Sequence, residues 1–282
     1  MNFTTLISPQ ELAGHCGSEE LLIVDCRFEL SDTAKGEQAW RQSHLPGAHY
    51  AHLDRDLSDL RKSGLGRHPL PDIDTFADVL VRWGWRPDMQ VVAYDDAAGS
   101  TAARLWWMLR LVGHQRAAVL DGGFAAWSAT GLPLSNLAPP QAGGEVDLAF
   151  AKDEIVYADE LSRGLHDGSV LLLDARGGAR FRGEVEPIDP VAGHIPGARN
   201  RPFSDNMGGN GLFKHPDELR DEFETVIAGY VPEQVVHSCG SGVTACHNLL
   251  AMEHAGLGGS RIFAPSWSGW IADPARPVAR GA

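Results

Sequence analysis

The fold of this chain is decided by the stretch His237-Ser238-Cys239-Gly240-Ser241-Gly242-Val243-Thr244-Ala245. A short β-branched run ending in Val235 and Val236 precedes it and predicts a buried strand. The residues from Ala245 to Ala255 predict a helix that Gly256 closes, and Thr244 is expected to cap its start. The cysteine is therefore expected between the end of a strand and the start of a helix.

The residues around Cys239 favour an anion at its sulfur. Gly240 and Gly242 let the backbone curl tightly, which turns successive N–H groups toward whatever the sulfur carries. The start of the helix adds partial positive charge. An isolated cysteine is more often a small buried apolar residue. Here the glycine spacing and the neighbouring hydroxyl groups indicate a thiolate nucleophile instead.

Length and composition indicate a globular protein with two domains. The chain has 282 residues, which favours two domains of about 140 residues each. Its formal net charge of −13 disfavours nucleic acid and anionic membranes as partners. No apolar run approaches the roughly 18 residues of a spanning helix, and the N-terminus lacks the pattern of a secretory signal. We therefore expect a cytoplasmic protein, whose oligomeric state the sequence leaves open.

Cysteine and histidine patterns indicate no metal site. The four cysteines show neither a repeated C-x-x-C spacing nor the density of a disulfide framework, which suits a reducing compartment. The twelve histidines form no H-E-x-x-H or comparable grouping. We expect no bound metal ion.

The signals of the first half recur in the same order in the second half. Apolar runs that predict strands are Leu21–Arg27, Gln90–Tyr94 and Ala117–Leu120, then Leu171–Arg176, Val235–Ser238 and Ile262–Phe263. A proline- and glycine-rich linker is predicted at 139–150. We predict an α/β fold of two tandem domains, 1–138 and 151–282, each a parallel sheet with helices on both faces.

Only the second domain is expected to be catalytic. Asp95 stands where Cys239 stands in the second half, so the first half lacks the nucleophile. Ligands of parallel sheets bind beyond the carboxyl ends of the strands, which is where Cys239 lies. Some polar residues recur in both halves although only one half has the cysteine, and these are expected to belong to the scaffold: Asp25, Asp174, His44 and His194.

The loop Cys239-Gly240-Ser241-Gly242-Val243-Thr244 closely resembles the active-site loop of the rhodanese superfamily, in the form found in its 3-mercaptopyruvate sulfurtransferases. The resemblance covers nearly the whole chain, including the duplication. It implies an enzyme that takes sulfur from 3-mercaptopyruvate onto Cys239 as a persulfide. It also implies transfer of that sulfur to cyanide, a thiol or a protein acceptor, without a metal or organic cofactor.

The resemblance also implies roles for individual residues. Asp54 and the pair Arg67-His68 resemble positions that the family brings to its active-site cleft. There an Asp, a His and a Ser form a set that handles protons, which implies this role for Asp54, His68 and Ser241. Arg180 falls on the substrate-binding arginine of the family. An arginine fork suits a substrate carboxylate. The rest of the loop is expected to line the substrate site: Gly240, Gly242, Val243 and Thr244.

Two further observations concern the arginines. Arg176, Arg180 and Arg182 follow a predicted strand, so one or more can reach the strand-end crevice. The chain departs from the family at Ile188, where a second arginine of a Glu-Pro-Arg segment is expected.

Three alternative functions differ from this interpretation in the residues they require. Thiosulfate:cyanide sulfurtransferase is the nearest, but Gly240-Ser241-Gly242 supplies no basic residue for a doubly charged donor. Phosphatases of the same fold use C-x5-R, whereas the sixth residue after Cys239 is Ala245. A rhodanese-like binding module need not keep the cysteine, and this loop is intact. Detection of a persulfide separates the enzyme from the module.

Overall fold

The computed structural model describes residues 1–281, and the chain divides into two compact units. Unit 1 comprises Met1–Asp59 and Leu70–Ala151. Unit 2 comprises Leu60–Pro69 together with the residues from Lys152 onward. A segment from the first half of the sequence, Leu60–Pro69, thus packs with the second unit.

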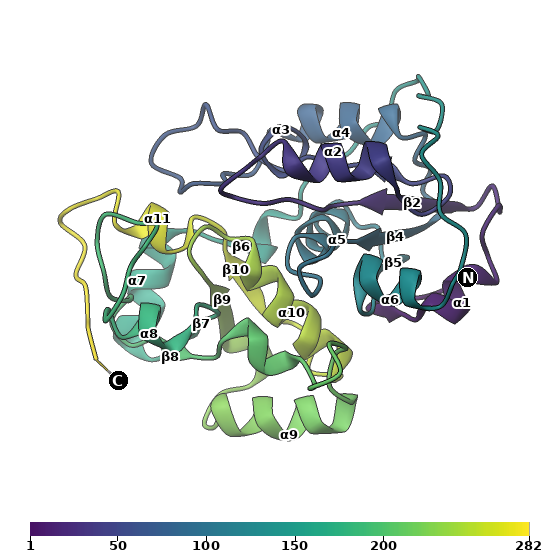
Figure 1. The fold of residues 1–282 in the computed structure, drawn as a ribbon. Coiled ribbons are helices and arrows are strands. Elements are labelled where there is room, and N and C mark those ends of the chain that lie inside the picture. Colours follow the sequence, from purple (N-terminus) through teal and green to yellow (C-terminus); the bar gives the residue numbers. More distant parts are fainter. Residues whose placement is uncertain (282) are drawn as a thin grey trace. The chain divides into compact units, whose positions relative to one another are not determined.

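Unit 1 is built on a five-stranded sheet in which every pairing is parallel and the order is β1-β5-β4-β2-β3 (Figure 1). Its strands are β1 Leu6–Ile7, β2 Leu21–Asp25, β3 His49–Tyr50, β4 Gln90–Tyr94 and β5 Ala117–Leu120. Its helices are α1 Pro9–Ala13, α2 Lys35–Gln42, α3 Leu53–Asp56, α4 Ile73–Arg82, α5 Ala102–Leu111 and α6 Gly123–Ala129.

Unit 2 repeats this sheet, with the order β6-β10-β9-β7-β8 and parallel pairing throughout. Its strands are β6 Ile155–Val156, β7 Leu171–Asp174, β8 Arg199–Asn200, β9 Val235–Ser238 and β10 Arg261–Phe263. Its α-helices are α7 Ala158–Asp167, α8 Gly178–Phe181, α9 Pro216–Val226, α10 Thr244–His254 and α11 Ser266–Trp270. Short 3-10 helices lie at Lys152–Glu154, Phe203–Asn206 and Pro232–Gln234. The predicted tandem α/β fold is confirmed.

The central strands are buried along their whole length, because helices cover the sheets. All five residues of β4 and all four residues of β7 and of β9 are buried. In unit 1, Leu12 of α1 and Trp127 of α6 pack with Ile23 and Val92 of the sheet. In unit 2, Leu172, Val236 and Phe263 form the corresponding cluster. Burial on both faces explains why these strands appear in the sequence as continuous apolar runs.

The two aspartates that recur in both halves, Asp25 and Asp174, have the scaffold role expected of them. In unit 1, Arg27 donates to both carboxylate oxygens of Asp25, at distances of 2.6 to 3.1 Å. Arg176 donates in the same way to Asp174 in unit 2, at 2.7 to 3.1 Å. Each guanidinium group also donates to a backbone carbonyl of the turn that follows, Ser43 or Gly193. These buried pairs fix the strand ends.

The predicted linker, residues 139–150, contains no helix or strand. Within it, the backbone N–H of Ala142 donates to the carbonyl of Arg82 in unit 1. Among the helices of the described residues, none has the length and apolar composition of a membrane span.

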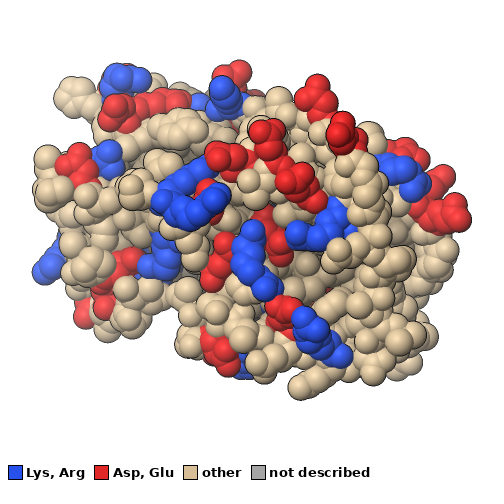
Figure 2. All heavy atoms as spheres, turned by 90° about the horizontal axis from the view of Figure 1, so that it is seen from above, with Lys and Arg blue, Asp and Glu red and all other residues tan. Residues whose placement is uncertain are grey.

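On the face shown in Figure 2, acidic and basic side chains are interspersed rather than separated into large patches of one sign.

Candidate active site around Cys239

Cys239 lies where the sequence predicts, between the end of β9 at Ser238 and the start of α10 at Thr244. Its side chain is buried, with 1% of the residue exposed. The backbone N–H of Gly242 donates to the sulfur, with nitrogen and sulfur 3.1 Å apart. The loop therefore turns a backbone donor toward Sγ, which favours negative charge there.

Gly242 cannot be replaced without disturbing this loop. Its φ is +80°, in the left-handed region, and a Cβ atom there would lie 2.2 Å from the carbonyl oxygen of Ala264. The prediction that Thr244 caps α10 is wrong. The helix begins at Thr244, its N-cap is Val243, and no side chain caps it. The chain enters the helix one residue earlier than expected, so the threonine already belongs to the first turn.

Ser266 supports the nucleophile from the neighbouring loop. Its hydroxyl oxygen accepts from the backbone N–H of Cys239 at 3.1 Å, and the hydroxyl donates to the carbonyl of Phe263 at 3.0 Å. The hydroxyl oxygen lies 3.9 Å from Sγ. Ser266 has a φ of +53°, which is strained for a residue other than glycine. Ser266 therefore contacts Cys239 through a side chain and a backbone conformation that no local sequence pattern indicates.

The corresponding loop of unit 1 holds a carboxylate of its own. Asp95 accepts four backbone hydrogen bonds of 2.8 to 2.9 Å, from Ala97, Gly99, Thr101 and Ala102. Converging N–H groups of this kind form an anion-binding concavity. In unit 1 the side chain of Asp95 fills this concavity, and the loop therefore has a structural role.

His68 and Ser241 lie together in unit 2. The Nδ1 atom of His68 is 2.8 Å from the Oγ atom of Ser241, and both residues are buried. Two members of the predicted proton-handling set are thus in hydrogen-bond contact, and one of them, Ser241, is two residues after Cys239 in the sequence. Asp54 lies in α3 of unit 1, where its backbone N–H donates to Nδ1 of His52. Its catalytic role stays a prediction.

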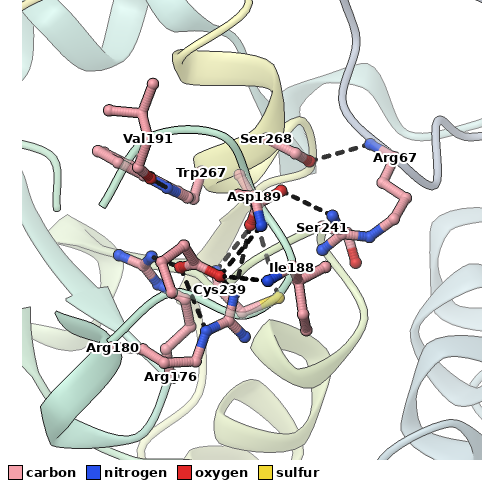
Figure 3. A network of polar contacts seen from close by, with 12 residues as sticks. Arg67, Arg176, Arg180, Ile188, Asp189, Val191, Cys239, Ser241, Trp267 and Ser268 are labelled. Atoms are coloured by element: carbon pink, nitrogen blue, oxygen red, sulfur yellow. Dashed lines mark hydrogen bonds and ion pairs between the residues drawn. The ribbon is translucent and has the colours of Figure 1, made fainter. Parts of the chain in front are cut away.

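Arg180 reaches the loop, and it is held by two carboxylates (Figure 3). Its Nε and Nη2 atoms donate to Glu186 at 3.3 and 2.7 Å, and Nη2 also donates to Asp189 at 3.2 Å. Arg67 donates from Nη1 to the other oxygen of Asp189 at 2.6 Å. A Cβ atom at Gly240 would lie 3.3 Å from Nη2 of Arg67 and 3.7 Å from Nη2 of Arg180. Two guanidinium groups therefore flank the residue that follows the nucleophile.

The other two arginines have different surroundings. Arg176 is part of the buried scaffold pair with Asp174. Arg182 pairs with Glu184, and both side chains are exposed. Of the three arginines expected at the crevice, Arg180 is the one whose guanidinium group faces Gly240.

The carboxylate of Glu186 stays ionised in this network. Burial raises its pKa, but the hydrogen bonds from Arg180 and from the backbone N–H groups of Asp189 and Ile188 outweigh burial and lower the pKa below its ordinary value. Glu186 can therefore hold Arg180 in place at neutral pH.

Residues 8–130 and 157–273 each match the family model described as a rhodanese-like domain. The chain belongs to the rhodanese family. The resemblance drawn from the Cys239 loop is thereby confirmed.

Relatives within the family align over the full length. A Pseudomonas aeruginosa protein named "Probable 3-mercaptopyruvate sulfurtransferase" is 48% identical over 287 residues, covering 100% of both chains. A Mycobacterium tuberculosis protein, SseB, named provisionally as a thiosulfate sulfurtransferase, is 38% identical and covers 98% of this chain and 97% of its own. The crystal structure of SseA from Escherichia coli, described as a 3-mercaptopyruvate sulfotransferase, is 31% identical with a TM-score of 0.81. It covers 94% of this chain and 100% of its own.

In this rhodanese, Glu186, Asp189 and Ser266 lie beside Cys239 or Gly240 without having been expected there, whereas the family pattern had already indicated Arg67. Arg67, Glu186 and Asp189 form one charged cluster beside Gly240, and Ser266 supports the cysteine. The acidic pair was visible in Glu186-Pro187-Ile188-Asp189, but only as a departure from the Glu-Pro-Arg pattern. Comparison of the two halves places Ser266 opposite Gly123, whose φ is +57°. Among the described residues, no group of three or more His, Cys, Asp or Glu side chains is arranged to hold a metal ion.

Proposed function

We propose that this protein is a 3-mercaptopyruvate sulfurtransferase in which Cys239 carries the sulfur. The observation that carries the proposal is a guanidinium group beside the nucleophile. A Cβ atom at Gly240 would lie 3.8 Å from Nη1 and 3.7 Å from Nη2 of Arg180. A donor whose thiol sulfur is near Cys239 can therefore place a carboxylate on Arg180. The names of the Pseudomonas aeruginosa relative and of the Escherichia coli structure support the same donor.

Sulfur moves to the enzyme in the first half of the reaction. The Cys239 thiolate attacks the sulfur of 3-mercaptopyruvate and forms an S–S bond. The carbon–sulfur bond breaks, and its electron pair leaves with carbon as the enolate of pyruvate. Cys239 is left as a persulfide whose outer sulfur keeps the donor's thiol proton. The N–H of Gly242 stabilises the thiolate of Cys239 before the attack, and Sγ loses its charge when the S–S bond forms.

The enolate requires one proton to become pyruvate. The hydroxyl of Ser241 is fixed by His68 at 2.8 Å, which makes this pair the proposed proton source. A proton delivered to the enolate carbon from Ser241 is replaced through the imidazole. Asp54 stays part of this proposed set through the family pattern alone.

An acceptor then releases the sulfur. Cyanide attacks the outer sulfur of the persulfide, and the S–S bond breaks with its electron pair going to Cys239, which regains its thiolate. Thiocyanate leaves, and the proton of the outer sulfur passes to solvent. A thiol of a small molecule or of a protein accepts the sulfur in the same way and becomes a persulfide. These steps need neither a metal ion nor an organic cofactor, because the cysteine carries the transferred group.

Thiosulfate is the second candidate donor. The sequence offered no basic residue within Gly240-Ser241-Gly242, but Arg67 and Arg180 bring positive charge to Gly240 from outside the loop. The Mycobacterium tuberculosis relative also carries a thiosulfate name. We favour 3-mercaptopyruvate because its carbon leaving group needs a proton, which the Ser241–His68 pair can supply. Sulfite, the leaving group of thiosulfate, has no such need.

The test is a comparison of kcat/KM for 3-mercaptopyruvate and thiosulfate on the wild-type protein. Both donors are measured with one acceptor at one ionic strength, because screening changes the attraction of a dianion more than that of a monoanion. We expect the value for 3-mercaptopyruvate to be higher. A protein that prefers thiosulfate would contradict the donor assignment and leave sulfur transfer through Cys239 intact.

We also infer a cytoplasmic location. All four cysteines are free, and Cys239 must be a thiolate to act. A reducing compartment keeps such thiols available.

A further inference from the structure

Arg67 is fixed to unit 2 by its own segment, Leu60–Pro69. The backbone N–H of Arg67 donates to the hydroxyl of Ser268 at 2.9 Å. The preceding residue, Gly66, has a φ of +90°, and a Cβ atom there would lie 2.4 Å from the carbonyl oxygen of Pro265. A close backbone approach on one side and a hydrogen bond on the other therefore set where the Arg67 side chain begins.

Asp189 and Glu186 determine how the two guanidinium groups are presented. Asp189 accepts from Arg67 through one oxygen and from Arg180 through the other, and its side chain is only 3% exposed. Two cations held this close would repel each other, and the shared carboxylate offsets that repulsion. Glu186 binds the Nε and Nη2 side of Arg180. The acidic residues thus occupy one edge of each guanidinium group.

The remaining edges of both groups face Gly240. A Cβ atom at Gly240 would lie 3.3 Å from Nη2 of Arg67 and 3.8 Å from Nη1 of Arg180. Across residues 1–281, the hydrogen bonds of the two guanidinium groups use Nη1 of Arg67 and the Nε and Nη2 atoms of Arg180. Nε of Arg67 is buried without a hydrogen-bond partner in that part of the chain. Two donors from different arginines therefore point to one place beside the nucleophile.

We infer that Arg67 is a second carboxylate-binding residue, which receives the donor's carboxylate together with Arg180. This inference rests on the proposed function and deepens it. Ile188 has no charged group to offer, and the side chain that faces Gly240 with Arg180 comes instead from a distant segment. One carboxylate oxygen is bound by Nη2 of Arg67 and the other by Nη1 of Arg180. Charge-assisted hydrogen bonds of this kind select a donor with a carboxylate over one without it.

The test compares two donors that differ only in the carboxylate. 3-Mercaptopyruvate and mercaptoacetone share the thiol and the ketone, and mercaptoacetone has a methyl group in place of the carboxylate. The variant is Arg67→Gln, and the matched control is Arg182→Gln, which removes an exposed arginine that pairs with Glu184. The rate of sulfur loading on Cys239 is measured for both donors on each protein.

We expect Arg67→Gln to lower kcat/KM for 3-mercaptopyruvate roughly ten- to a hundred-fold, mainly through KM, and to leave mercaptoacetone within about two-fold. Arg182→Gln should behave as wild type with both donors. Equal losses with the two donors would show that Arg67 acts only on the structure of the loop, and no loss with either would remove it from the site. Either result overturns the inference.

A binding measurement covers the case in which mercaptoacetone reacts too slowly to follow. The Kd of 3-mercaptopyruvate is measured on Cys239→Ser protein with and without Arg67→Gln. We expect Kd to rise roughly ten-fold or more in the double variant. An unchanged Kd overturns the inference. A failure of the proposed function is seen separately, because the wild type would then form no persulfide from 3-mercaptopyruvate at all.

Discussion

The backbone N–H of Gly242 points at the sulfur of Cys239, with the nitrogen 3.1 Å from Sγ. The contact depends on the left-handed backbone of Gly242, which lies against the carbonyl of Ala264. In unit 1, four backbone N–H groups surround the Asp95 carboxylate at the same place in the fold. The loop of unit 1 therefore gathers backbone donors around a carboxylate, and the corresponding loop of unit 2 directs a backbone donor at a sulfur.

Replacing Gly242 with Ala should damage both the loop and the chemistry. The added Cβ would meet the Ala264 oxygen at 2.2 Å, and φ of +80° is strained for alanine, so the variant should lose about 1 to 3 kcal/mol or more of stability. Its rate of persulfide formation should fall by at least about ten-fold, since Sγ loses its donor. Thermal unfolding and single-turnover loading check both. Gly209→Ala is the control, because open space surrounds that glycine.

Ser241 and His68 should act as one unit. Ser241→Ala and His68→Asn are each expected to lower kcat for 3-mercaptopyruvate roughly a hundred-fold, with a smaller change in KM, because each interrupts proton delivery. The double variant should be no worse than the poorer single variant. Steady-state kinetics on the three proteins check this prediction. Losses that multiply in the double variant would mean that the two residues act independently.

The fold could be predicted from the sequence because its signals are local. Buried parallel strands appear as apolar runs such as Leu171–Asp174, and the same order of runs occurs twice. The position of Cys239 at a strand end follows from these runs and from the glycines after it. Arg180 was found through a family pattern that spans only a few residues.

The family pattern indicates Arg67, but neither its contact with Asp189 nor the position of Ser266 could be found in this way. Arg67 and Asp189 are 122 positions apart in the sequence, and their contact depends on how Leu60–Pro69 packs onto unit 2. No periodicity records such a long-range contact. Ser266 has a left-handed backbone, which is usual for glycine and rare for serine, so its residue type does not predict its conformation.

Asp95 should prove essential for stability and irrelevant to the chemistry. Asp95→Ala leaves four buried N–H groups without their acceptor and should cost on the order of 3 kcal/mol or more. Asp95→Asn should also destabilise, because its NH₂ group would face two N–H donors. Chemical denaturation measures the free energy of unfolding, with Asp96→Ala, at an exposed residue, as the control. A stability close to wild type in Asp95→Ala would refute the structural role.

The buried imidazole of His237 should make the protein less stable in acid. Burial lowers its pKa from 6.5 to about 3, so between these values the unfolded chain binds a proton that the folded chain does not. The free energy of unfolding therefore falls as pH falls below 6.5, by about 2 kcal/mol from this residue between neutral pH and pH 5.

His237→Gln should reduce this acid sensitivity. Glutamine can keep the hydrogen bond that joins Nε2 of His237 to the hydroxyl of Ser260, 3.1 Å apart, but it does not titrate. Denaturation curves at pH 7.5 and pH 5 measure the difference, with the exposed His166→Gln as the matched control. An unchanged pH dependence in His237→Gln would show that other groups cause the acid sensitivity.

The most direct test of the account is mass spectrometry of the protein after brief exposure to 3-mercaptopyruvate. We expect one additional sulfur atom on the peptide that contains Cys239, its removal by cyanide, and its absence from a folded Cys239→Ser variant. A sulfur found instead on Cys16, Cys26 or Cys246 would contradict the assigned site. No added sulfur on the wild type with any donor would contradict sulfur transfer itself and favour a binding module.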